Sequence, residues 1–452
     1  MSFPRYPKYK DSGVEWLGEV PAHWDVISIK WLSPVKRGAS PRPIDDSKYF
    51  DDEGEFAWVR IADVSACDGI LYETTQRLSE LGSSLSVKIT PGELFVSIAG
   101  TVGKPCVSAI KACIHDGFVY FPTLKIDPLF LYRVFEGGTC YGGLGKWGTQ
   151  LNLNTDTIGS IRVALPPPVE LKLVLAFLDR ETAKIDELVA EQRRLMELLK
   201  EKRQAVISHA VTQGLNPNAP MKPTCIEWLG EVPAHWDLKR VRFVAELNPS
   251  KSETNELDRD TSVSFLPMEA IGENGSLNLD KEKSISEVET GYTYFRDGDV
   301  TVAKITPCYE NGKGALMCGL LNGIGFGTTE LIVARPRPGA VTGIFLHYLF
   351  ISPDFRYLGE SHMYGAGGQK RVPDAFVRDF ETAFPPLTEQ TLIAAFLDQE
   401  LAKIDTLTTE AQRAIDLLQE RRTALISAAV TGQIDVRNTV SAAQVSPVAT
   451  CV

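Results

Sequence analysis

The chain has 452 residues, of which 44% are hydrophobic and 23% are charged, a composition typical of folded proteins with more than one core. No apolar run approaches the ~20 residues of a membrane-spanning helix, and the N-terminus lacks the apolar segment of a secretory signal. The net charge of −11 and the absence of any CxxC pair among eight cysteines argue against a basic nucleic-acid-binding domain and a structural zinc site.

We therefore expect a cytoplasmic protein with reduced thiols.

No long segment carries a net positive charge: residues 1–165 hold 17 basic and 19 acidic side chains, and residues 215–384 hold 17 basic and 23 acidic side chains. Any contacts with nucleic-acid phosphates must then come from local clusters. The affinity of this chain alone should be modest, and a basic partner is expected to supply the rest.

The first distinctive segment, Val14–Val26, returns at Ile226–Leu238 with eleven of 13 positions identical. A second match, from Ala176 to Thr212, returns 219 residues later. These matches predict an internal duplication in which a globular unit and a long helix occur twice. Residues that are identical in both copies cannot distinguish two different target sequences, so we assign a packing role against the helices to four tryptophans: Trp16, Trp24, Trp228 and Trp236.

Short β-rich runs follow each copy of the motif and are bounded by Gly, Pro, Asp and Asn, as strands joined by tight turns are. Residues 58–64 resemble 265–271, and residues 91–97 resemble 297–303. The two globular parts therefore share a pattern of strands while their side chains diverge.

Prolines at 166–168 and at 385–386 end each globular part and allow a helix to begin. Apolar residues then recur every seven positions, which is the period of a coiled coil. The first helix has Leu171, Leu178, Ile185, Leu199 and Val206, with the polar Gln192 completing the series and Leu188 and Leu195 at the intervening positions. The second helix has Leu397, Ile404, Ala411, Leu418 and Leu425, with Ile393, Leu407 and Ala414 at the intervening positions. We expect the helices to pair antiparallel around a pseudo-twofold axis; the alternative is that each folds back on its own globular part.

The repeated Trp-Leu-Gly-Glu-Val-Pro-Ala-His-Trp motif, Ile98–Lys104, and the Pro-Pro step into Ala-Phe-Leu-Asp and Ala-Lys-Ile-Asp together resemble the specificity (S) subunit of type I restriction-modification systems. The resemblance extends to about residue 434. It implies an α+β fold with target recognition domains at 1–165 and 215–384, long coiled-coil helices at 166–214 and 385–434, and a flexible tail at 435–452.

The resemblance also implies a function and partners. Each target recognition domain would read one half of a gapped double-stranded DNA site, and the helices would set the spacing and dock two methyltransferase (M) subunits. The M subunits would bind S-adenosylmethionine and methylate adenine at N6. A restriction (R) subunit that uses ATP and Mg would cut unmodified DNA.

The chain itself is expected to be non-catalytic and to bind no cofactor or metal. The nearest string to a methyltransferase loop, Asp127–Phe130, lacks the second proline and predicts a turn that opens a short helix. Ser97–Gly103 matches a cofactor loop only in part and predicts a strand and a tight turn, and no P-loop is present.

Three loops in each half combine Gly or Pro with side chains that contact phosphates or base edges. They lie after the repeated motif, at the centre of the globular part and before its last strand. The predicted DNA-binding residues are Lys36, Arg37, Arg42, Thr101, Lys104, Lys146 and Gln150 in the first half, and Lys251, Lys304, Lys313, Gln369, Lys370 and Arg371 in the second. For each loop the alternative is an ordinary solvated surface.

Two other functions fit the pattern less well. A coiled-coil scaffold with two protein-binding heads would suit the acidic charge. The recognition module of another DNA-modification system would share the duplicated architecture.

Overall fold

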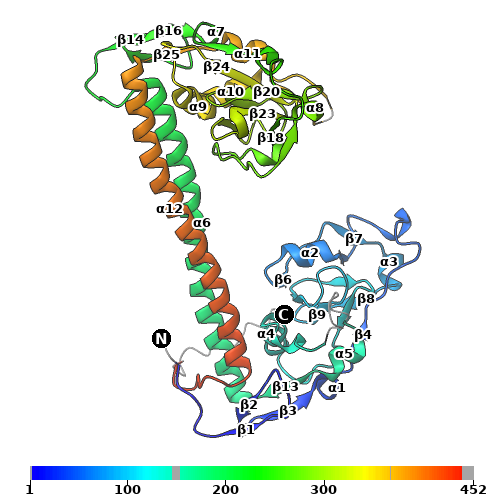
Figure 1. Cartoon of the computed structure of the whole chain (residues 1–452). Coiled ribbons are helices and arrows are strands. Elements are labelled where there is room, and N and C mark those ends of the chain that lie inside the picture. Colours follow the sequence, from blue (N-terminus) through cyan, green and yellow to red (C-terminus); the bar gives the residue numbers. More distant parts are fainter. Residues whose placement is uncertain (1–2, 145–152, 367, 440–452) are drawn as a thin grey trace. The chain divides into compact units, whose positions relative to one another are not determined.

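The computed structural model of the chain describes residues 3–144, 153–366 and 368–439. Its contacts divide the chain into two compact units, called here unit 1 (residues 1–192 and 413–452) and unit 2 (residues 193–412). Each unit combines one globular part with about half of each long helix (Figure 1).

The long helices are α6 (Pro168–Gln213) and α12 (Leu387–Val430). Both begin directly after prolines, which cannot continue the preceding strand. A glycine with positive φ, a conformation that side chains with a Cβ rarely adopt, follows each helix: Gly214 (74°) directly after α6 and Gly432 (72°) two residues after α12. Among the described helices, none is long and apolar enough to cross a membrane.

Within each unit, the contacts between the two helical segments run in opposite chain directions. In unit 1, Arg180 of α6 donates to the carbonyl of Thr439 beyond the end of α12 (2.9 Å), whereas Asp186 pairs with Arg422 (2.8 Å). In unit 2, Arg203 of α6 pairs with Asp405 of α12, and Gly214 lies against Glu389. The two ion pairs are related by the 219-residue offset of the sequence repeat.

Most of the heptad stripe is buried, and Ile393 between its members is buried as predicted, but three other residues predicted between them are exposed. Leu178, Ile185, Leu397 and Ile404 are at most 5% exposed, whereas Leu188, Leu195 and Leu407 are 44%, 40% and 51% exposed. Three other buried positions lie four residues after a stripe member instead of three: Val189, Leu401 and Ile415. A spacing of 3.5 residues requires alternating steps of three and four, and periodicity alone does not fix which comes first.

The globular part of unit 1 is built from two mixed sheets and two ribbons. The first sheet has the order β4 (Lys36–Arg37), β12 (Phe118–Tyr120), β9 (Leu94–Ser97), β10 (Pro105–Ser108) and β6 (Ile70–Leu71). The second has β7 (Gln76–Leu78), β5 (Phe56–Val59), β11 (Ala112–Ile114) and β8 (Val87–Ile89). The ribbons pair β1 (Tyr9–Asp11) with β2 (Glu19–Pro21), and β3 (Asp25–Ser28) with β13 (Arg162–Leu165). The short helices are α1 (Ile29–Leu32), α2 (Ile61–Ala66), α3 (Glu80–Ser84), α4 (Pro128–Glu136) and α5 (Thr155–Ser160).

Unit 2 has a similar set of strands, but its first sheet has four described strands where that of unit 1 has five. Its first sheet has the order β17 (Ala245–Leu247), β24 (Leu331–Pro336), β21 (Val300–Ala303) and β22 (Gly314–Leu316). Its second sheet has the order β19 (Glu282–Ser284), β18 (Ser262–Leu266), β23 (Ile324–Gly327) and β20 (Thr293–Arg296). Its ribbons pair β14 (Met221–Pro223) with β15 (Glu231–Pro233), and β16 (Asp237–Arg240) with β25 (Glu381–Phe384). The short helices are α7 (Val241–Val244), α8 (Ile285–Val288), α9 (Gly343–Ile351), α10 (Pro353–Ser361) and α11 (Asp374–Asp379).

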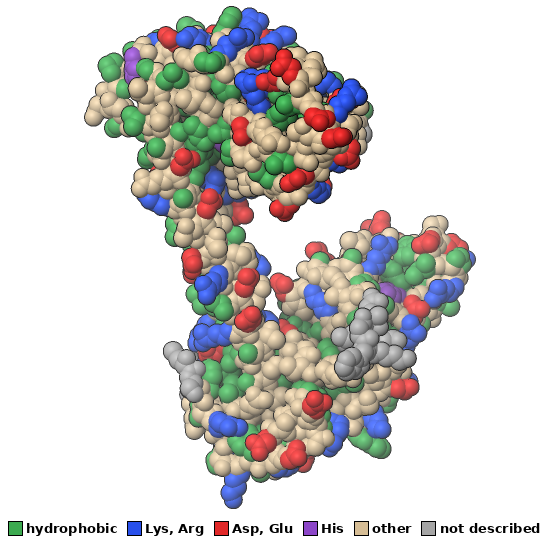
Figure 2. All heavy atoms as spheres, viewed as in Figure 1, with side chains coloured by type: hydrophobic (Ala, Val, Ile, Leu, Met, Phe, Trp, Pro, Cys, Tyr) green, Lys and Arg blue, Asp and Glu red, His purple; other side chains and the backbone are tan. Residues whose placement is uncertain are grey.

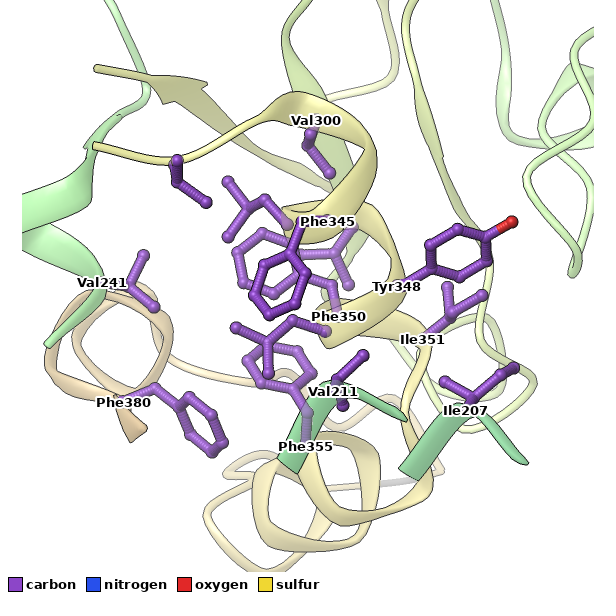
Figure 3. Close-up of a cluster of buried hydrophobic side chains, with 14 of the residues drawn as sticks. Ile207, Val211, Val241, Val300, Phe345, Tyr348, Phe350, Ile351, Phe355 and Phe380 are labelled. Carbon is purple, nitrogen blue, oxygen red and sulfur yellow. The ribbon is translucent and has the colours of Figure 1, made fainter. Parts of the chain in front are cut away.

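The largest apolar cluster of unit 2 joins its globular part to the helices. Phe345, Phe350 and Phe355 pack beside Ile207 and Val211 of α6 (Figure 3). All five are at most 3% exposed. Burying side chains of this size contributes about 2 kcal/mol each, so the helices are part of the hydrophobic core of unit 2.

The predicted α+β class is confirmed, and so is the prediction that Asp127 opens a short helix: its carboxylate accepts from the Leu129 amide at the start of α4 (2.9 Å). The predicted start of the tail at residue 435 is wrong. Val436 is fully buried, and the Asp435 amide donates to the Pro4 carbonyl (2.7 Å). The N-terminal segment therefore packs against the residues that follow α12, a contact between chain ends that sequence patterns do not encode.

Candidate nucleic-acid interface

The repeated Trp motif lies where each globular part meets a long helix, as predicted. In unit 1, the buried Glu170 of α6 accepts hydrogen bonds from the Trp24 indole (3.1 Å), His23 (2.8 Å) and the Tyr6 hydroxyl. In unit 2, His235 bonds to Glu389 of α12 (2.7 Å). Trp24 and Trp236 are both fully buried, which confirms their packing role.

The first predicted loop of unit 1 is fixed by Asp116. The Asp116 carboxylate accepts from the Ser40 hydroxyl (3.1 Å) and the Arg42 guanidinium (2.9 Å), and its backbone carbonyl accepts from Arg37. Burial alone would raise the pKa of Asp116, but Ser40, Arg42 and Arg37 together hold this pKa below its usual value. Lys36, in β4, is exposed. Arg37 and Arg42 are therefore held by Asp116, whereas Lys36 faces solvent.

The lysines of the two central turns point inward. Lys104 donates to the carbonyls of Ser65 (3.0 Å) and Cys67 (2.9 Å) at the end of α2. Lys313 donates to the Met268 carbonyl in the matching position of unit 2 (3.2 Å). Because both ammonium groups satisfy backbone carbonyls, their geometry is that of structural caps. Thr101 bonds to the Ser65 hydroxyl (2.9 Å) and stays exposed.

The remaining predicted residues of unit 2 are also partly engaged. Lys251 donates to the Glu289 carbonyl, and Lys304 is half-buried. Arg371 makes a bidentate pair with Glu330 (2.7 and 2.9 Å), whereas Gln369 and Lys370 are exposed. Lys146 and Gln150 lie outside the described residues.

A cluster that the sequence analysis missed lies on the outer face of the sheet β7-β5-β11. Trp58 of β5 pairs with Gln76 of β7 and with Cys113 of β11. Because side chains alternate along strands, Arg60 and His115, two residues further on, belong to the same face. Trp58, Arg60, Gln76 and His115 line an open cavity of about 690 Å³, called here the Arg60 pocket, together with Ile44, Asp45, Ser47 and Phe50.

The Arg60 pocket adjoins the predicted loop 36–42. His115 precedes Asp116 in the chain, and the amide of Ala39 donates to the Ile114 carbonyl (3.2 Å). The loop therefore leads directly from Arg37 and Arg42 to the wall of the pocket. The alternating pattern that ends in Trp58 and Arg60 was the one sequence signal for this pocket. That pattern does not show which strands lie beside β5.

The corresponding face of unit 2 carries different groups. Lys283 of β19 lies 4.8 Å from the ring centroid of Phe265 in β18 and 5.9 Å from that of Tyr292. The two rings meet edge-on at 5.0 Å. This cluster of two rings and a cation offers stacking and cation–π contacts instead of a polar pocket.

The described surface carries no region of one charge sign on the face that Figure 2 shows, where Lys and Arg alternate with Asp and Glu over both globular parts. Among the residues that the structure describes, no group of three His, Cys, Asp or Glu is placed to hold a metal ion. The candidate interface is therefore a set of local clusters, as the segment charges predict.

Comparison with known proteins finds specificity subunits of type I restriction enzymes among the relatives of this chain. The chain is 40% identical over 192 residues to the type I restriction enzyme EcoAI specificity subunit of Escherichia coli, a match that covers 42% of this chain and 32% of that relative. It is 22% identical over 437 residues to the EcoKI specificity subunit of Escherichia coli strain K12, covering 92% and 90% of the two chains. No protein-family model matches the sequence.

Two solved structures share the fold. The HsdS subunit from Thermoanaerobacter tengcongensis aligns over 92% of this chain and 98% of its own, with a TM-score of 0.50 and 15% identity. A chain from a study of complex assembly in the type I R-M system aligns over 91% and 98%, with a TM-score of 0.58 and 16% identity. The resemblance that the repeated motifs indicate is therefore confirmed: the chain is similar to the specificity subunits of type I restriction-modification systems, at 40% identity over 42% of its length and at 22% identity over 92%.

Proposed function

We propose that this chain is the DNA-specificity subunit of a type I restriction-modification complex and has no catalytic activity of its own. Each globular part reads one half of a gapped double-stranded DNA site. The paired helices act as a coiled coil that sets the spacing and docks two M subunits, which bind S-adenosylmethionine and methylate adenine at N6. An R subunit with ATP and Mg cuts unmodified DNA in the cytoplasm.

One observation carries this proposal: two units with similar strands each hold half of both helices, through ion pairs related by the same offset. Asp186–Arg422 in unit 1 corresponds to Arg203–Asp405 in unit 2. This equivalence supports a pseudo-twofold arrangement, as a bipartite DNA site requires. The differing side chains of the two globular parts support two different half-sites.

Exposed leucines on the helices support two equivalent docking sites. Unit 1 exposes Leu188 (44%) and Leu417 (56%), and unit 2 exposes Leu198 (52%) and Leu407 (51%). Leu188 corresponds to Leu407, and Leu198 to Leu417, at the 219-residue offset. Given the antiparallel contacts, the two leucines of each unit lie within about one helical turn of each other along the axis. Apolar side chains that a helix pair leaves uncovered suit a protein partner.

The proposal is tested by sequencing the methylated bases of a host that carries this chain with its M subunits. We expect a bipartite motif with methylated adenine that disappears when the chain is deleted. A motif that persists without the chain would contradict the proposal, and the absence of any bipartite motif would favour a scaffold function.

Docking is tested by native mass spectrometry of the complex. Replacing Leu188 and Leu417 by Asp is expected to reduce two bound M subunits to one, and replacing Leu198 and Leu407 should do the same. Leu81 of α3, which is 50% exposed, supplies the matched control: Leu81→Asp should keep two M subunits. Unchanged stoichiometry in both double variants would place the docking surface elsewhere.

A further inference from the structure

The Arg60 pocket is lined by side chains that are held before any ligand arrives. The Arg60 amide, which opens α2, donates to the Asp63 carboxylate (2.8 Å), and this bond fixes the backbone at Arg60. The Arg60 guanidinium donates to the side-chain oxygen of Gln76 across the two strands. The guanidinium therefore has a preferred position on the sheet face, although Arg60 is exposed.

The groups left free in this pocket are mainly hydrogen-bond donors. Because Gln76 accepts from Arg60 through its oxygen, its amide NH₂ remains available. The Gly117 amide donates to Nδ1 of His115 (2.8 Å), and burial lowers the pKa of this imidazole, so the neutral ring carries its proton on Nε2. Arg60, Gln76 and His115 thus offer guanidinium, amide and imidazole N–H groups from three adjacent strands.

An acidic residue in the wall narrows the choice of ligand. The carboxylate of Asp45 lines the same cavity and would repel a phosphate group. A base pair edge fits better. In the major groove, guanine presents two acceptors, N7 and O6, and its partner cytosine presents an amino donor. Donors beside one carboxylate acceptor complement that edge.

We propose that the Arg60 pocket reads a G·C pair in the half-site recognised by unit 1, with Arg60 on the guanine edge and Gln76 holding the guanidinium in place. The inference rests on the proposed function and adds the base that one unit selects. Unit 2 carries Phe265, Lys283 and Tyr292 on the corresponding face, so its half-site is read by other means.

The test uses the complete complex of this chain with its M subunits. Methylated motifs are compared between the wild type and the variants Arg60→Ala, Arg60→Lys and Gln76→Ala. Lys111→Ala is the matched control, because Lys111 is an exposed cation of the same unit that pairs with Glu55 (2.6 Å) outside the pocket. The exposure of Arg60 makes loss of folding by its variants unexpected, and thermal unfolding checks this.

For Arg60→Ala we expect one G·C position in one half-site to become degenerate, with discrimination there reduced about 10- to 100-fold and the other half-site unchanged. Arg60→Lys should lose much of the discrimination despite keeping its charge, because only arginine presents two parallel donors. A DNA duplex with 7-deazaguanine at this position should bind the wild type more weakly but leave binding by Arg60→Ala unchanged.

The proposal is overturned if Arg60→Ala leaves the motif unchanged, relaxes both half-sites, or behaves like Lys111→Ala. A wild-type complex that methylates no bipartite motif would instead refute the proposed function. The two failures are therefore distinguishable in the same experiment.

Discussion

The globular parts of the two units are attached to the long helices by different kinds of interaction. In unit 1, Arg133 of α4 pairs with Glu136 and with Asp179 of α6 (2.7 Å each), and Arg422 joins the same network. In unit 2, the corresponding helix α9 presents Tyr348, whose hydroxyl donates to Asp398, and an apolar cluster joins it to the helices. One arrangement of strands and helices thus tolerates both a charged and a largely apolar junction.

The glutamates at the Trp motif differ in the same way. Glu170 accepts three hydrogen bonds, two of them from the buried Tyr6 and Trp24. Glu389 accepts from the half-exposed His235, and the indole N–H of Trp236 has no partner among the described residues. Polar groups at the junction should therefore matter more for the stability of unit 1 than for that of unit 2.

The largest expected difference concerns these two glutamates. Glu170→Ala leaves two buried donors without an acceptor, and we expect it to lower the free energy of unfolding by about 3–5 kcal/mol. Glu389→Ala should cost about 1 kcal/mol because His235 can turn to water. Chemical denaturation of the full chain measures both, and equal losses would remove the contrast between the junctions.

Acid should weaken the packing around α9 in unit 2. Burial lowers the pKa of His347 in α9 from its ordinary 6.5 to about 4, against the opposing influence of Asp398. Folding therefore favours the neutral ring: its stabilisation is complete above pH 6.5 and is lost as the pH falls towards 4, by about 3 kcal/mol in total.

Arg203, Asp398, Asp405 and Tyr348 line the same cavity as His347. Hydrogen exchange of α9 between pH 7 and pH 4.5 measures this loss of stability. The variant His347→Leu should show a smaller dependence of exchange on pH. In unit 1, Tyr132 occupies the equivalent place against a glycine of positive φ, so α4 should show little change. If α4 and α9 lose protection equally, His347 is not the cause.

The charged junction itself gives a smaller effect. Arg133→Ala removes a side chain that is 13% exposed and leaves Glu136 with Arg422 and the Tyr132 hydroxyl, so we expect a loss of about 2 kcal/mol in unfolding free energy. Tyr348→Phe should lose about 1 kcal/mol. Thermal unfolding of both variants shows which one loses more stability. A larger loss for Tyr348→Phe would contradict the greater importance of polar groups at the junction of unit 1.

The smallest expected effect is chemical. In unit 1, the thiol of Cys67 lies 3.6 Å from that of Cys106, and this contact, with Lys104 nearby, lowers the pKa of Cys67 to about 6. We expect Cys67 to alkylate several-fold faster at pH 7 than the exposed Cys225 of unit 2, with a rate that falls below pH 6. Peptide mass spectrometry of the labelled chain measures this, and Cys106→Ala should slow Cys67.

The sequence by itself determined the duplicated plan, the two long helices and the packing role of the Trp motif. These features depend on local periodicity, on prolines and glycines at helix ends, and on identity between the copies. The heptad stripe was predicted correctly, yet the exposure of Leu188, Leu195 and Leu407 was not. Whether a buried residue follows a stripe member after three or after four positions depends on the packing of the partner helix, and sequence periodicity does not specify that packing.

Only the tertiary structure decided which cations are free and which side chains meet. Lys104 and Lys313 look like phosphate ligands in a glycine turn, but the fold directs both towards backbone carbonyls that need donors. Arg60, Gln76 and His115 come from strands far apart in the chain, and the register of those strands places the three side chains on one face. Strand pairing over such distances is set by packing of the whole globular part, so no local pattern could have gathered them.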